Sequence, residues 1–152
     1  NTYEQRLQRP YLNQDFFKLI QENKNVLKPV IFFAHLNDKI IAGSLCFRDK
    51  NALYGRHWGS SFNIDSLHFE CCYYQGIEYC INKGLKKFDP GVQGEHKIRR
   101  GFEPIKTNSY HLIINEDFRS AILDFCLREK REIDNYLEAC KRYTPFNKDY
   151  KI

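Results

Sequence analysis

The stretch from residue 52 to residue 89 limits the possible folds of this chain more than any other part of the sequence. "ALYGRHWGS" (52–60) has the composition of a β-strand, and a helix is expected to follow it over residues 66–83. Gly84 stands where a glycine commonly ends a helix, and "LKKFD" (85–89) is then a second strand. A strand, a helix and a strand in this order form a parallel crossover. We therefore expect two parallel strands covered by one helix.

The central helix of this crossover carries an apolar face. Asp65 or Ser66 can cap its first turn, and Gly76 lies near its middle. A glycine inside a helix costs about 1 kcal/mol relative to alanine, so Gly76 predicts close packing against a neighbouring backbone. The apolar or small residues that recur at helical spacing are Phe69, Cys72, Tyr73, Gly76, Ile77, Cys80 and Ile81.

Two more strands are expected ahead of the crossover. "VIFFAHL" (30–36) and "KIIAGSLCFR" (39–48) are separated by Asn37 and Asp38, a pair that favours a tight hairpin turn. Together with residues 52–60 they form an antiparallel meander. The sequence thus predicts an α/β fold of the α+β type, in which a mixed sheet combines this meander with one parallel β–α–β crossover.

Helices are expected near both ends of the chain. "LNQDFFKLIQEN" (12–23) has apolar residues at helical spacing, with Asn13 as a suitable N-cap. "TNSYHLII" (107–114) predicts a further strand, and Asn115 or Asp117 opens a last helix.

Length and composition favour a single domain over residues 1–152. The chain begins at Asn1 and contains no methionine, so we expect it to be a fragment of a longer protein. No apolar run is long enough to cross a membrane, and no secretory signal is visible.

The six cysteines lie in apolar segments without a Cys-x-x-Cys pair, which favours reduced thiols, a cytoplasmic location and no metal site. The net charge of +5 favours anionic ligands.

Charge and glycine are concentrated in "DPGVQGEHKIRRGFEP" (89–104), which has three glycines and four basic side chains. Glu95 or His96 is suited to take a proton from an attacking amine, and Lys97 is suited to neutralise an oxyanion or a phosphate. These three residues are the candidate catalytic groups. The alternative interpretation is a short helical turn, opened and closed by glycines, whose charges complement its dipole. The two interpretations are compatible.

Candidate binding residues lie on the third strand and in this loop. Strict alternation places Tyr54, Arg56 and Trp58 on one face of the strand and His57 on the other. Arg56 is suited to hold a phosphate or carboxylate and His57 to act as a base; otherwise they are a rim arginine and a satisfied, half-buried histidine. Because ligands favour the ends of parallel strands, we expect residues 54–61 and 89–97 to converge there. The substrate-binding candidates are Tyr54, Arg56, His57, Trp58, Glu70, Gln93 and Arg99.

Several catalytic motifs are missing from the sequence. It contains no P-loop, no nucleophile-elbow serine, no dinucleotide fingerprint and no pair of metal ligands on a helix. This excludes typical NTPases, ordinary hydrolases, Rossmann oxidoreductases and zincins.

The quoted segments together resemble a known family. "LYGRHWG", "LHFECCYYQGIEYCINKG" and "PGVQGEHKIRRGF" are similar to the strand, helix and loop of the GNAT-like acyltransferases of the FemABX branch. The closest likeness is to the bacterial peptidoglycan biosynthesis/recognition family, which "YLNQDFF" (11–17) and "YTPF" (143–146) also fit.

The resemblance implies an acyl-CoA N-acyltransferase fold and transfer of an acyl or aminoacyl group to an amine, such as that of a peptidoglycan precursor or another small-molecule or peptide acceptor. It implies that this chain is the C-terminal part of a longer protein, whose missing N-terminal region packs against it. Lys97 corresponds to a lysine that assists transfer in the branch. The connection "SSFNIDSLHF" lacks the glycine-rich cradle for a CoA pyrophosphate. Acyl-CoA and aminoacyl-tRNA are therefore both possible donors of the transferred group. No metal cofactor is expected.

The missing cradle also motivates an alternative function. The same groove would then belong to a non-catalytic module that recognises a cell-wall peptide, a nucleotide-sugar or tRNA.

Overall fold

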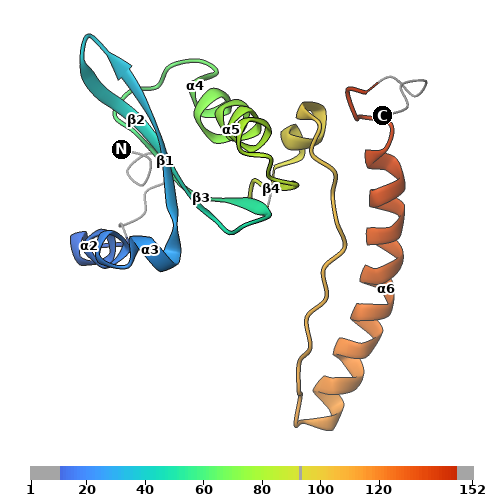
Figure 1. Ribbon diagram of the computed structural model, residues 1–152. Coiled ribbons are helices and arrows are strands. Elements are labelled where there is room, and N and C mark those ends of the chain that lie inside the picture. The colour runs from blue at the N-terminus through green and yellow to red at the C-terminus, as the bar shows by residue number, and fades with distance from the viewer. Residues whose placement is uncertain (1–10, 93, 147–152) are drawn as a thin grey trace. The chain divides into compact units, whose positions relative to one another are not determined.

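The hairpin and crossover expected from the sequence form one sheet in this computed structural model, which describes residues 11–92 and 94–146. Its four strands lie in the order β1-β2-β3-β4 (Figure 1). The strands are β1 Pro29–Leu36, β2 Lys39–Arg48, β3 Ala52–Ser60 and β4 Lys87–Asp89. The first three are antiparallel neighbours, and β3 pairs with β4 in parallel. The prediction of a mixed α+β sheet is confirmed.

The chain divides into two compact units, whose described parts are residues 11–92 and 94–146. The first unit contains the sheet and the helices that pack on it. Asn37 and Asp38 turn the β1–β2 hairpin with positive φ angles of 47° and 62°. Gly84 ends the central helix with φ 63°, as its position predicts.

The central helix is not uniform. It consists of α4 Leu67–Phe69, the π-helix η1 Glu70–Tyr74 and α5 Gln75–Lys83. In the π-helix the N–H of Gln75 donates to the carbonyl of Glu70, five residues back. The wider turn shifts which side chains face the sheet.

The apolar stripe predicted from regular helical spacing is therefore only partly right. Cys71, outside the stripe, is 4% exposed, whereas Ile81, inside it, is 74% exposed. Cys71 and Gly76 are both buried although five positions separate them, which is the spacing of a π-turn. Gly76 and Cys80 are buried as predicted.

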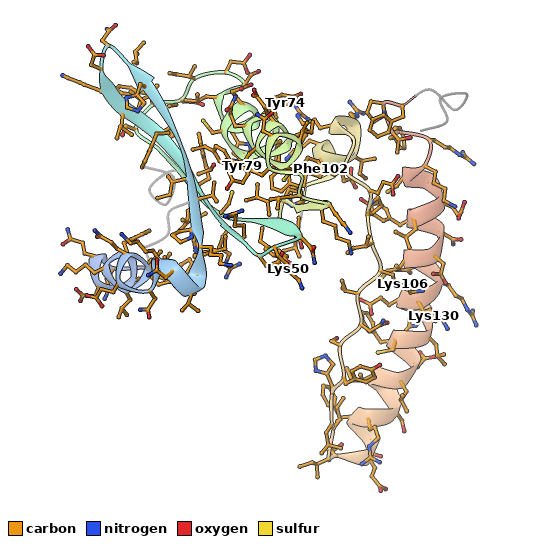
Figure 2. The ribbon with its side chains drawn as sticks, viewed as in Figure 1. Lys50, Tyr74, Tyr79, Phe102, Lys106 and Lys130 are labelled. Carbon is orange, nitrogen blue, oxygen red and sulfur yellow. The ribbon has the colours of Figure 1, made fainter. Side chains whose placement is uncertain are left out.

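The core lies between α5 and the sheet. Cys46, Leu53 and Cys80 form its buried cluster, and Tyr79 packs against it (Figure 2). Gly76 packs as closely as expected, but its neighbour is a ring: a methyl group on Gly76 would overlap the side chain of Phe88. The other partly buried side chains around the cluster are Val30, Phe32, Leu85 and Phe88.

A β-bulge interrupts β3 and corrects the predicted alternation of its side chains. Cys46 pairs with Gly55 and Leu45 with His57, so Arg56 is an additional residue opposite β2. Beyond it, the alternation changes phase. Tyr54 and Trp58 therefore lie on opposite faces of the sheet, and Tyr54 shares its face with His57.

Helix α2 Gln14–Glu22 begins where the sequence predicts it. The N–H of Phe16 donates to the Asn13 side chain at 3.0 Å, so Asn13 is the N-cap. The Phe16 ring lies 6.0 Å from the His57 ring. Helix α3 Lys24–Leu27 follows directly.

The second unit contains the 3₁₀ helix η2 Glu95–Arg100, an extended segment and α6 Glu116–Cys140, which Asn115 caps. The predicted strand over residues 107–114 is wrong, because the segment pairs with no strand in the described parts of the chain. It runs beside α6 (Figures 1 and 2), and the preceding Lys106 forms an ion pair with Asp134. Tyr110 is 96% exposed. The segment is thus extended and exposed without strand pairing among the described residues, although its composition is typical of a strand.

Candidate functional site

A small cavity lies where β3 passes into the central helix. It has a volume of about 80 Å³ and belongs entirely to the first unit. The residues that line it are Trp58, Ser60, Phe62, Asn63, Ile64, Leu67 and His68. Trp58 is thus the predicted binding residue that contributes to a cavity; we call this site the Trp58 pocket.

Aromatic packing fixes one wall of the Trp58 pocket. The His68 ring meets the Trp58 ring edge-on, with centroids 5.4 Å apart, and it meets the Tyr73 ring in the same way at 5.4 Å. Edge-to-face pairs of this kind restrict ring orientation beyond what burial alone does. The sequence interpretation did not select His68, although the density of rings between residues 57 and 69 is a visible signal.

The loop that forms the other wall is tied to the sheet. The N–H of Ser61 donates to the carbonyl of Ile41 at 2.8 Å, and the N–H of Phe62 donates to the Ser60 hydroxyl at 3.2 Å. The side chain of Asn63 is exposed and makes no hydrogen bond with the described residues. The pocket therefore has a fixed frame and a polar group at its edge.

Ser44 couples the sheet to the π-helix. It is almost fully buried, stands directly opposite Trp58 in the β2–β3 register, and donates its hydroxyl to the carbonyl of Cys71 at 2.7 Å. Because Cys71 belongs to the π-helix, this bond fixes the rotation of the helix above the sheet. That rotation in turn places His68 against Trp58.

Replacing Ser44 by alanine should therefore disturb the pocket as well as the stability. We expect a loss of about 1 kcal/mol in the free energy of unfolding. We also expect a changed fluorine NMR resonance of fluorotryptophan at position 58, which is the only tryptophan in the chain.

Leu45→Val is the matched control, because Leu45 is the next residue and lies on the other face of β2. It should cost a comparable free energy, about 1 kcal/mol, without moving the resonance. An unchanged resonance in Ser44→Ala would contradict the coupling.

The other candidates on β3 lie away from the pocket. The Tyr54 hydroxyl donates to the Asp49 carboxylate at 3.0 Å, and that carboxylate raises the pKa of Tyr54. His57 is half-buried beside Phe16 and Tyr11, and burial, with Arg56 nearby, lowers its pKa. Arg56 is exposed in the bulge. The structure thus separates Trp58 from Tyr54 and His57 by the thickness of the sheet.

Glu70 opens the π-helix on its exposed side. Its carboxylate accepts a hydrogen bond from the Gln75 side chain at 2.8 Å. This bond spans the π-turn, so Glu70 has a structural partner there. Gln93, another predicted binding residue, lies outside the described residues.

The remaining candidates share one turn in the second unit. Gly94 precedes η2 with φ 95° and Gly101 follows it with φ 88°, so the predicted glycine-bounded turn is confirmed. Glu95 and Arg99 are exposed on it, whereas Lys97 is 9% exposed. The three catalytic candidates and Arg99 therefore lie in the same turn.

The side chain of His96 lies close to Gly94 and to two positively charged residues. Its ring folds back over Gly94, where a methyl group would lie 2.5 Å from the ring. Arg100 donates to the His96 carbonyl at 2.8 Å. Burial, together with the positive charges of Arg100 and Lys97, lowers the pKa of His96 below its ordinary 6.5. The imidazole is therefore neutral at pH 7 and able to accept a proton.

Across 11–92 and 94–146, no cluster of three His, Cys, Asp or Glu side chains is placed to hold a metal ion. No helix in those ranges combines the length and apolar character needed to cross a membrane. All six cysteines are free thiols, and burial, with Cys80 nearby, raises the pKa of Cys46 to about 11.

The structure thus combines a mixed α+β sheet, a pocket at the end of β3 and, in the second unit, a basic glycine-bounded turn. The chain matches the FemAB-like family model, described as peptidoglycan biosynthesis/recognition, over residues 1–148. The chain belongs to this family, as its sequence resemblance predicts. No curated protein and no solved structure matches it.

Proposed function

We propose that this FemAB-like chain serves peptidoglycan biosynthesis by transferring an acyl or aminoacyl group to an amine of a precursor. The observation that carries the proposal is the turn Glu95–Arg100, which brings Glu95, His96 and Lys97 together and leaves Lys97 only 9% exposed. A lysine side chain withdrawn from solvent beside two other ionisable groups is a candidate for charge stabilisation at a functional site. The GNAT-like assignment of the fold belongs to the same proposal.

Each side chain has a defined task in the reaction. The acceptor nitrogen attacks the carbonyl carbon of the donor, and a C–N bond forms. His96, or Glu95 in its place, accepts the proton that the nitrogen loses, while Lys97 stabilises the negative charge on the carbonyl oxygen. The bond to the leaving group then breaks, and the proton passes to that group. Arg99 is suited to hold an anionic part of the substrate.

The donor is a thioester of CoA or an ester of tRNA. In the first case a C–S bond breaks, and in the second a C–O bond. The basic charge of the chain favours either anionic carrier. Arg56, Glu70 and Gln93 remain proposed binding residues. Tyr54 and His57 are proposed for one face of the sheet and Trp58 for the other, because the bulge in β3 places them on opposite faces.

Mass spectrometry of a peptidoglycan precursor tests the proposal. The full chain would be incubated with the precursor and either acyl-CoA or aminoacyl-tRNA. A mass increase equal to the transferred group, and dependent on the protein, is the expected result. If no donor gives a product while the precursor binds saturably, the second candidate is favoured: a module that recognises its ligand without catalysis. The Trp58 pocket, with Asn63 at its edge, is the observation that supports that alternative.

The pH dependence of transfer should follow His96. Because its pKa is lowered, the neutral form persists to pH values below 6.5, and the rate should fall only as the pH drops through that lowered pKa. A His96→Gln variant should be slower and should lose this acidic limb. A limb that persists unchanged in the variant would assign it to another group, such as Glu95.

A further inference from the structure

The Trp58 pocket is lined by two side chains that can form hydrogen bonds, Trp58 and Asn63. Neither side chain is hydrogen-bonded to another residue of 11–92 or 94–146. Phe62, Ile64 and Leu67 supply apolar surface around them. The surface of the pocket is therefore mainly polar, with a smaller apolar part from these three side chains.

Its size limits what can enter. The volume of about 80 Å³ exceeds the roughly 10–15 Å³ of cavity space that one water needs, and it is smaller than the roughly 150 Å³ of a cavity that takes benzene. A group of about four heavy atoms fits between these limits. Whole sugars, bases and long acyl chains are too large to enter completely.

Its charge limits the ligand further. No lysine, arginine, aspartate or glutamate is among the residues that line the pocket, and His68 is the ionisable side chain there. A carboxylate, phosphate or ammonium would lose its hydration there without meeting a permanently charged partner. The suitable group is neutral, carries both a donor and an acceptor, and has an apolar end.

We propose that the Trp58 pocket binds the acetamido group of an N-acetylated amino sugar. The Trp58 N–H would donate to the acetamido oxygen, the Asn63 amide would pair with the acetamido N–H, and the methyl group would contact the apolar wall. The sugar ring would remain at the mouth, beside the aromatic rings. The choice of sugar rests on the proposed role in peptidoglycan, whose glycan is built from such sugars.

Fluorine NMR of the full chain labelled with fluorotryptophan tests this directly, because Trp58 is the only tryptophan. Titration with N-acetylglucosamine should shift the resonance saturably. Glucosamine and glucose, which lack the acetyl group, should produce no saturable shift at the same concentrations. An equal response to glucosamine, or no saturable response to N-acetylglucosamine, would overturn the proposal.

Two variants test whether the sugar binds in the Trp58 pocket. Asn63→Ala should weaken binding about threefold to tenfold, the effect of one lost hydrogen bond. Lys50→Ala, in the turn before the other end of β3, should bind like the parent chain. Equal weakening in both variants would show that the shift reports another site.

The test separates this inference from the transfer reaction. Sugar binding is measured without a donor, so it stands even if no donor yields a product. Conversely, transfer to the precursor without any sugar-dependent shift would remove the acetamido site and leave the proposed function intact.

Discussion

Replacing Lys97 by alanine should lower the rate of transfer by about 10²- to 10³-fold, because one charged donor to the oxyanion is lost. Single-turnover measurements with saturating donor are the appropriate assay, since they report the chemical step. The reduction should appear in kcat with little change in KM, as expected for an interaction that strengthens in the transition state.

Two companion variants separate charge from packing at this position. Lys97 is buried, so Lys97→Met keeps most of the aliphatic volume and removes the charge, whereas Lys97→Arg keeps the charge. We expect Lys97→Met to be as slow as the alanine variant and Lys97→Arg to recover part of the rate. A Lys97→Met variant with the parental rate would contradict the role in charge stabilisation.

Replacing Gly76 by alanine should lower the free energy of unfolding by about 1–3 kcal/mol. The direction is opposite to the gain of about 1 kcal/mol that helix propensity alone gives this substitution. The cause is the Phe88 ring, which occupies the space that the new methyl group needs. Urea unfolding should show a lower midpoint with an unchanged slope.

A second substitution tests this cause. Phe88→Leu removes part of the ring, so Gly76→Ala should cost less in that background than in the parent chain. Asn82→Ala, on the exposed side of the same helix, is the control and should not destabilise the chain. Equal costs of Gly76→Ala in both backgrounds would show that Phe88 is not the obstacle.

Local signals in the sequence were sufficient for most of the secondary structure. Asn13 and Asn115 cap their helices, Asn37 and Asp38 turn the hairpin, and Gly84 ends the central helix, because each of these roles depends on a few neighbouring residues. The parallel pairing of β3 and β4 follows from the order of the elements alone.

Features that depend on partners were not predictable in the same way. The π-helix is stabilised by Ser44, which lies 27 positions from Cys71, and no local pattern encodes that bond. The bulge at Arg56 depends on how β3 pairs with β2. Residues 107–114 have the composition of a strand, but composition does not supply a neighbouring edge.

The candidate site was predictable in part for the same reason. The turn around Lys97 was visible because its glycines, charges and length are local. Trp58 was selected as an aromatic residue on a strand, but its face was assigned wrongly because the bulge was not visible. His68 and Asn63 were missed, since only the folded connection after β3 brings them beside Trp58.

Because of the π-helix, the side chains before it and the side chains after it point in directions that are set separately. Residues before it face the Trp58 pocket, and residues after it, such as Cys80, face the core. In a regular α-helix one rotation would fix both sets together. Here, core substitutions in α5 can accumulate during evolution while the pocket keeps its shape, and the ligand preference can drift without unfolding the sheet.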